Sequence, residues 1–392
     1  MGVISLRGMT WDHPRGFDPL AGGVNIYRRD HPDVDIVWEK RSLREFGEAP
    51  IESYASRYDL LIIDHPFVGY AAQNPCLIDW SAHLSADDRR AFSVDSVGNS
   101  WSSYHYHDRI WALPIDAATQ VASYRPDLLA KLGSGPPITF EDLLDLATRA
   151  RKRGMFVCTT AFPTDAICTV ISIAGNLGHL IVDQTPIFLP ETIGREVMSR
   201  FRAIVDVGHP NSIRWNPISA YDYMSAHDDV VYCAYGYGYT NYSRRENRNK
   251  LRFGDVVAHN TNGPAGTQLG GTGIAVSSQC AHPDAALEYA RWLCTVAHQT
   301  GDYYRLGGQP ASLAAWSSPD LNADCDSFFF NTLATLQGAH VRPRFNGWIP
   351  FCEAAGERVA ACLRRELSEA ALLSWLNQGF ARAQDAAKIA RA

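Results

Sequence analysis

Short apolar runs alternate with amphipathic segments over the first third of the chain. Residues 3–9 (VISLRGM), 34–38 (VDIVW) and 59–64 (DLLIID) are dominated by apolar and β-branched side chains, and each predicts a short buried strand. Helical patterns occupy the two intervals between them. The order strand, helix, strand, helix, strand at this spacing is typical of a parallel α/β sheet.

The two helices in these intervals have recognisable ends. We expect the first to start at Asp18-Pro19, where an acid at the N-cap precedes a proline at the first helical position, and to end near Arg29. The second is predicted from Ser42 to Tyr58, with a break at Gly47.

The same reading predicts elements along the rest of the chain. Residues 138–154 form an amphipathic helix that Thr139 caps, with acids in its first turn and bases in its last. Residues 229–243 (DVVYCAYGYGYTNYS) are a strand that runs into a loop of glycines and tyrosines. The remaining predicted elements are strands within 109–124, 155–160 and 270–279, and helices at 164–178, at 282–299 and from Phe351 to the C-terminus.

An Asp-His-Pro tripeptide occurs three times. Asp12-His13-Pro14 follows the first predicted strand, and Asp64-His65-Pro66 follows the third. Ligands of open α/β sheets bind beyond the carboxyl ends of the strands. We therefore expect these two copies to line a pocket. Asp30-His31-Pro32 lies between a helix and the next strand, at the opposite edge, and is interpreted as a helix stop.

Length and charge narrow the class of protein. A chain of 392 residues is too long for one compact core, so two lobes are expected. The net charge of −6 argues against a nucleic-acid partner. The sequence contains no run of 18 apolar residues, so no membrane span is predicted. Nine cysteines without a CxxC spacing indicate reduced thiols. The first residues lack a signal-peptide pattern, so a cytoplasmic location is expected, or a periplasmic one if a leader was trimmed.

Four segments together resemble the extracellular solute-binding protein family 1 of sugar-type ABC transporters. Each match is weak alone, but their order along the chain is that of the family. The segments are ALPIDAATQVASYRPDLLAKLG (112–133), LGGTGIAVSSQCAHPDAALEYARWLC (269–294), GGQPASLAAW (307–316) and RPRFNGWIPFCEAAGERVAACLRRELSEAALLSWLNQ (342–378).

The resemblance implies a periplasmic binding protein type II-like fold of class α/β, with two lobes around a hinged ligand cleft. One lobe would comprise residues 1–117 and 263–315, and the other residues 118–262 and 316–392. The chain would cross between the lobes near Asp116–Ala122 and again near Ala258–Gly270. The implied partner is a small polar ligand of sugar, polyol or amine type, and an ABC transporter permease if the chain is exported.

Carried onto this sequence, the ligand site lies at loop ends that bear aromatic, acidic and hydroxyl side chains. Aromatic faces stack on sugar CH groups or attract cations, and carboxylates hold hydroxyl or ammonium groups. The expected ligand-binding residues are Trp11, Asp12, His13, Asp64, His65, Asp116, Thr164, Asp165, Tyr235, Tyr237, Tyr239, Gly271, Thr272, Arg344 and Trp348.

A second interpretation is a cytosolic enzyme recruited from the same fold. His13 or His65 would act as general acid or base, with Asp12 or Asp64 orienting it. Cys158 is the candidate thiol nucleophile, against the alternative that it is a small buried apolar residue. The same histidines and aspartates could also converge on a metal, but no metal-binding spacing is present, so no metal and no cofactor are expected.

Overall fold

The computed structural model describes residues 3–245, 251–261 and 263–389. Its centre is an eight-stranded mixed sheet in the order β2-β1-β3-β10-β6-β8-β7, with β9 paired to β6, and β4 and β5 form a separate small hairpin. The strands are β1 (Ile4–Trp11), β2 (Val34–Arg41), β3 (Leu60–Ile63), β4 (His105–Tyr106), β5 (Arg109–Ile110), β6 (Leu113–Tyr124), β7 (Phe156–Cys158), β8 (Val230–Tyr237), β9 (Arg252–Gly254) and β10 (Leu269–Val276).

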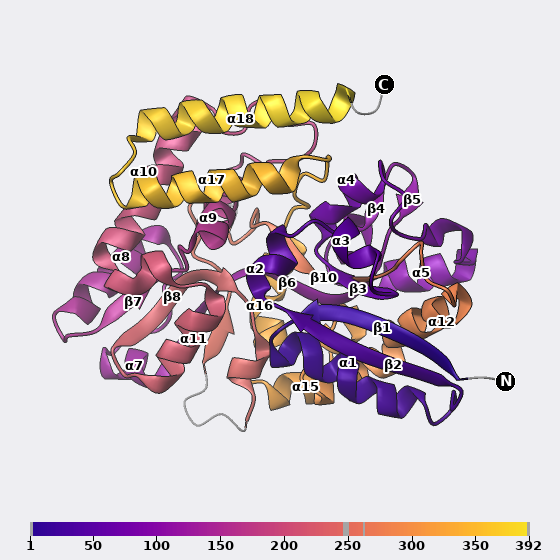
Figure 1. Ribbon diagram of the computed structural model, residues 1–392. Coiled ribbons are helices and arrows are strands. Elements are labelled where there is room, and N and C mark those ends of the chain that lie inside the picture. Colours follow the sequence, from indigo (N-terminus) through magenta and orange to yellow (C-terminus); the bar gives the residue numbers. More distant parts are fainter. Residues whose placement is uncertain (1–2, 246–250, 262, 390–392) are drawn as a thin grey trace.

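Helices surround both ends of this sheet (Figure 1). None of the described helices is long and apolar enough to cross a membrane. The helices are α1 (Pro14–Tyr27), α2 (Leu43–Glu48), α3 (Glu52–Ala55), α4 (Val68–Ala71), α5 (Ala86–Asp95), α6 (Ser100–Ser103), α7 (Pro126–Lys131), α8 (Phe140–Arg151), α9 (Pro163–Asn176), α10 (Glu191–Val207), α11 (Pro217–Ala226), α12 (Pro283–Leu293), α13 (Val296–His298), α14 (Leu313–Trp316), α15 (Pro319–Asp324), α16 (Phe328–Gln337), α17 (Trp348–Leu363) and α18 (Glu369–Ile389).

The first three strands form the parallel arrangement that the sequence predicted. β1 pairs in parallel with β2 along its whole length and with β3 at Gly8 and Met9. β10 then adds antiparallel to β3, so the sheet becomes mixed beyond the first three strands. The carboxyl ends of β1 and β3 therefore lie close together, which brings Trp11 and Asp64 to the same edge.

β6 joins the two ends of the sheet. Its first half pairs with β10, and its second half pairs with β8 and β9. Leu113 and Ile115 belong to the apolar core around β1–β3, whereas Ala122 belongs to the core under α8, α9, α10 and α17. In Figure 1 these two groups of elements lie on either side of β6. One buried strand thus contributes to both of these cores, and Ala117 and Val121 from its middle belong to a third.

The start of α1 differs from the sequence-based expectation. The helix begins at Pro14 rather than at Asp18-Pro19, because Pro14 occupies the first helical position and His13 serves as the N-cap. His13 Nδ1 accepts a hydrogen bond from the Arg15 backbone N–H at 3.0 Å, which satisfies one of the free first-turn amides. The earlier start turns Arg15 into a helical residue.

The predicted helix over 42–58 is also divided differently. Gly47 lies inside α2, and the break falls at Ala49-Pro50. Ala49 has ψ of 142°, the extended conformation that a following proline favours, so the helix ends before it. The third Asp-His-Pro copy is a helix stop, as expected: Asp30, His31 and Pro32 form the turn between α1 and β2.

A close backbone approach fixes the segment that leads into α17. A Cβ atom on Gly69 of α4 would lie 1.3 Å from the Arg344 carbonyl oxygen. Only a residue without a side chain allows the two segments to meet there. The contact sets the position of the chain that carries Arg342, described below.

We predict that Gly69→Ala lowers the free energy of unfolding by at least about 2 kcal/mol, because the new methyl group must push the 342–348 segment away from α4. Urea denaturation followed by tryptophan fluorescence measures the change. Gly135→Ala is the control, since a Cβ there meets no atom within 4 Å. Equal stability of the two variants would contradict the claim that the close approach of Gly69 to the Arg344 backbone excludes a side chain.

Candidate functional site

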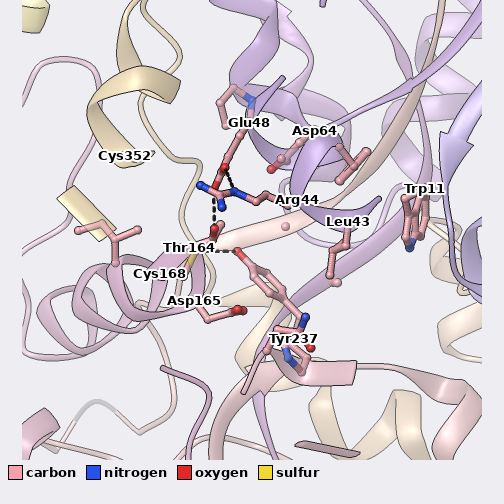
Figure 2. A pocket seen from close by; sticks show the side chains of 18 of the residues that line it. Trp11, Leu43, Arg44, Glu48, Asp64, Thr164, Asp165, Cys168, Tyr237 and Cys352 are labelled. Carbon is pink, nitrogen blue, oxygen red and sulfur yellow. Dashed lines mark hydrogen bonds and ion pairs between the residues drawn. The ribbon is translucent and has the colours of Figure 1, made fainter. Parts of the chain in front are cut away.

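A cavity of about 400 Å³ lies beside the central strands, between β1, α2 and the end of β3 on one side and α9 and α17 on the other. Figure 2 shows Trp11 and Leu43 on one side of it, Cys168 and Asp165 on the other, and Tyr237 below. This volume is within the usual range for small-molecule sites. The wall combines apolar and aromatic residues with several charged ones.

The members of the wall come from segments far apart in the sequence. They are Trp11, Arg15, Ser42, Leu43, Arg44, Phe46, Gly47, Glu48, Asp64, Pro66, Ala118, Phe162, Thr164, Asp165, Ile167, Cys168, Ile171, Asn216, Pro217, Tyr237, Tyr239, Gln268, Gly270, Gly271, Thr272, Arg342, Trp348, Ile349, Cys352 and Glu353.

A buried ion pair forms one side of the cavity. Arg15 Nε and Nη2 donate to the two carboxylate oxygens of Asp116 on β6, at 2.8 and 2.5 Å. Arg15 Nη1 also donates to the Gly238 carbonyl at 2.6 Å, and its guanidinium lies 4.4 Å above the Tyr239 ring. Arg15 therefore connects α1, β6 and the segment after β8, and Asp116 balances its charge.

A second ion pair reaches across the cavity from the segment before α17. Arg342 Nη2 lies 2.6 Å from both carboxylate oxygens of Asp64. Burial alone would raise the pKa of Asp64, but the Arg342 guanidinium and a hydrogen bond with His65 lower it to about 2. Asp64 is therefore ionised at neutral pH, and Arg342 is its counter-charge.

α2 contacts the opposite wall through polar side chains. Thr164 Oγ1 donates to Glu48 Oε1 at 2.6 Å, and Arg44 Nε donates to Glu48 Oε2 at 2.7 Å (Figure 2). Arg44 also approaches Glu353 and Glu357 of α17 at 3.9 and 4.0 Å. These contacts bridge the two walls of the cavity.

Asp165 differs from the other wall carboxylates. It lies in the first turn of α9, is 7 % exposed, and projects into the cavity (Figure 2). Its own backbone N–H is its hydrogen-bond partner, and no described cation lowers its pKa. Burial raises the pKa of Asp165 to about 8, so the carboxyl is mostly protonated at neutral pH.

Several other polar atoms of wall residues have no hydrogen-bond partner within the described part of the chain. They are Trp11 Nε1, Thr272 Oγ1, Gln268 Oε1 and Arg342 Nε. Buried polar groups are normally hydrogen-bonded, so unpaired groups on a cavity wall favour a polar ligand.

Most of the residues that the sequence singled out belong to the wall. At Gly271, which is one of them, φ is +93° and a Cβ atom would lie 2.4 Å from the Asp116 carbonyl oxygen, so this part of the wall is backbone that no side chain can cover. The predicted residues that line the cavity are Trp11, Asp64, Thr164, Asp165, Tyr237, Tyr239, Gly271, Thr272 and Trp348.

The Asp-His pairs do not line the cavity as pairs. Trp11 faces the cavity, so the next residue, Asp12, faces solvent and forms an ion pair with Lys40 at 2.9 Å. His13 caps α1 and packs edge-on against Tyr239. His65 is fully buried behind Asp64 in a short turn.

Three further predicted residues lie outside the wall. Asp116 is buried beneath Arg15, which occupies both of its carboxylate oxygens. Tyr235 lies earlier on β8, in the core beside α8 and α9, and its hydroxyl is hydrogen-bonded with His259. Arg344 donates to the carbonyl oxygens of the 102–105 segment.

The residues proposed for acid–base chemistry are therefore not assembled in the cavity. Burial and the nearby Arg15 charge lower the pKa of His13 to about 3, and burial with the Arg342 charge lowers that of His65 to about 4. Cys158 is fully buried on β7, and burial raises the pKa of its thiol. No cluster of metal-ligating side chains occurs among the described residues.

Sequence reasoning missed the three arginines of the wall. Arg15 is in the opening stretch GMTWDHPRG, but the later helix start that we expected places it in a loop. Arg342 is two residues from the chosen Arg344, and nothing in the Arg-Pro-Arg sequence distinguishes them. Arg44 belongs to an ordinary amphipathic pattern. Spacing gives no signal for the contacts of Arg15 and Arg342, because their partners are distant in sequence, whereas the pair of Arg44 with Glu48 has the local i,i+4 spacing of a helix.

We predict that Asp116→Asn lowers the free energy of unfolding by about 3 to 5 kcal/mol, because it leaves the buried Arg15 charge without a partner. The double variant Arg15→Met with Asp116→Leu should recover most of this loss, since an apolar pair needs no counter-charge. Chemical denaturation measures both. If Asp116→Asn is as stable as the parent, the folded protein does not depend on Asp116 to balance the buried Arg15 charge.

Asp165 should make stability depend on pH. Its folded pKa of about 8 lies above the unfolded value of about 3.9, so its contribution is fully present below about pH 4 and is lost as the pH rises to about 8. Between pH 4 and pH 8.5 the free energy of unfolding of the parent should therefore fall, relative to that of Asp165→Asn, by on the order of 2 to 5 kcal/mol. Urea denaturation at both pH values measures this, with Asp18→Asn, at an exposed site, as the control.

Comparison with solved structures shows the same fold in proteins of low sequence identity. Maltose-bound MalE3 of T. maritima is 16% identical, with a TM-score of 0.81 over 99% of this chain and 100% of that chain. A solute-binding protein from Thermotoga lettingae, bound with α-D-tagatose, is 15% identical, with a TM-score of 0.82 over 98% and 100%. One from Agrobacterium radiobacter, in complex with ribitol, is 18% identical, with a TM-score of 0.79 over 99% of both chains.

The fold is thus that of the MalE-like type II periplasmic binding proteins. None of the curated proteins matches the sequence. The family model described as bacterial extracellular solute-binding protein matches residues 48–326, which is more than half of the chain. Members of this family bind small-molecule ligands and typically work with an ABC transporter. The chain belongs to the bacterial extracellular solute-binding protein family.

Proposed function

We propose that this protein binds a small polyhydroxylated ligand, a sugar or a polyol, in the cavity between β1, α2 and α9. The observation that carries the proposal is the composition of the wall, where aromatic rings and hydrogen-bonding side chains face one enclosed volume. The ligands named for the solved relatives, maltose, tagatose and ribitol, belong to this chemical class.

The wall offers the two kinds of contact that such a ligand needs. Trp11, Phe162 and Tyr239 supply aromatic groups against which CH groups of a sugar ring can pack. Thr272 and Gln268 supply hydroxyl and amide groups with free hydrogen-bonding capacity. The ion pairs of Arg15 and Arg342 hold the wall in a fixed shape without offering net charge.

We also propose that the chain is divided into two lobes, residues 1–117 with 263–315 and residues 118–262 with 316–392. β6 supports this division at its two ends, because Leu113 and Ile115 belong to one core and Ala122 to another. A third core, with Ala117 and Val121 from the middle of β6, would lie at the junction of the lobes. Ligand binding would close the lobes about the crossings near 116–122 and 258–270.

In this function the protein delivers its ligand to an ABC transporter permease. That role requires the binding site to lie outside the cytoplasm, as the family description implies. The cytoplasmic location expected from the first residues stays a prediction, and protease accessibility in intact cells tests it.

Thermal unfolding in the presence of maltose, tagatose and ribitol tests the proposed function. A ligand at about 100 times its Kd stabilises the folded state by about 2.7 kcal/mol, so a cognate ligand should raise the Tm by at least about 2 °C. Small-angle scattering of the same samples should show a smaller radius of gyration with ligand. No rise with any sugar or polyol would contradict the proposal.

A variant that blocks the cavity gives the matched control. Leu43→Trp adds a large side chain to the wall, so it should abolish the ligand-dependent rise in Tm. Val94→Trp makes a large addition at a position on α5 that is 71 % exposed and outside the cavity, so it should keep the rise. An equal response of the two variants would place the ligand elsewhere.

A further inference from the structure

The arginines of the cavity wall all have carboxylate partners inside the protein. Arg15 is paired with Asp116, Arg342 with Asp64, and Arg44 with Glu48. Asp165 is the buried wall carboxyl for which the described residues supply no cation.

The surroundings of Asp165 cannot replace that cation. Among the described residues, the titrating groups that interact with Asp165 are the Tyr239 hydroxyl and the Cys168 thiol. Burial raises their pKa to about 12 and about 11, so both are neutral at physiological pH. The amides in the first turn of α9 offer only about half a positive charge in total. A carboxylate formed here remains undercompensated until something enters the cavity.

A neutral hydroxyl group does not explain a carboxyl at this position. An asparagine or threonine would bind a hydroxyl without the cost of burying an ionisable group. A carboxylate gains its largest interaction from a cation in the same water-poor space, through a charge-assisted hydrogen bond. Asp165 is 93 % buried and aimed into the cavity, where the described residues supply no cation and a bound molecule can supply one.

We propose that the ligand carries a protonated amine, as amino sugars and amino polyols do, and that this ammonium group pairs with Asp165. The inference rests on the proposed function, because it names the class of ligand for the same cavity. The ammonium would lie in the part of the wall that Phe162 and Tyr239 share with Asp165, where aromatic rings add to cation binding.

Matched pairs of probes that differ in one group test the proposal. We would titrate 1-amino-1-deoxysorbitol against sorbitol, and ethanolamine against ethylene glycol, and follow tryptophan fluorescence and Tm at about pH 8.5. At that pH an alkylamine with a pKa near the value of about 10.4 for lysine is still charged. Each amine should bind at least about tenfold more tightly than its hydroxyl counterpart. Ethanolamine is small enough to report on Asp165 whatever the skeleton of the natural ligand.

Asp165→Asn, which keeps the shape of the side chain, should remove the preference for the amine. Asp18→Asn, at an exposed position outside the cavity, should keep it. Below about pH 8 the affinity of the parent for ethanolamine should fall by roughly tenfold per pH unit, because binding must first remove the Asp165 proton. The variant should show no such slope.

The outcomes separate this inference from the proposed function. Binding of maltose, ribitol or tagatose without any Asp165-dependent preference for amines overturns the inference and leaves the proposed function intact. The absence of binding by sugars, polyols and amines alike overturns both. A preference for amines that survives in Asp165→Asn also overturns the inference, since another group would then hold the ammonium.

Discussion

The bidentate contact between Arg15 and Asp116 is the interaction on which the cavity depends. It joins the first helix to the strand that is shared by the two cores, and the additional bond to Gly238 ties in the end of β8. A guanidinium is suited to this place, because its planar group of donors can satisfy several acceptors in different directions at once. The side chain that holds three elements together also forms part of the surface that a ligand meets.

The internal pairing of arginines has a consequence for recognition. A wall with free guanidinium groups would favour anionic ligands, whereas these groups already face Asp64, Asp116 and Glu48. Selectivity then rests on shape, on aromatic faces and on the few polar atoms left without partners. Asp165 stands apart within this set, because the described residues supply no cation for it.

Hydrophobic periodicity was enough to predict the parallel start of the sheet, the cap at Thr139 and the buried helix that became α9, because these features are local. Ordered motifs were enough for the family. The site was predictable only at strand ends, where topology places Trp11 and Asp64 together. The helix cap of His13 has a local signal in Pro14, but the expected helix start at Asp18-Pro19 hid it. The role of Arg342 depends on a partner almost 300 residues away, which no local pattern encodes.

In the proposed function, the bridge formed by Thr164, Glu48 and Arg44 would affect how long a bound molecule stays. A ligand held between α2 and α9 would leave only after these hydrogen bonds and the contacts to α17 break. Entry into a molecule whose bridge is open would meet no such barrier. The bridge would then act on the dissociation rate more than on the association rate, so the residence time of the ligand could be tuned at Glu48 without altering Asp165 or the aromatic wall residues.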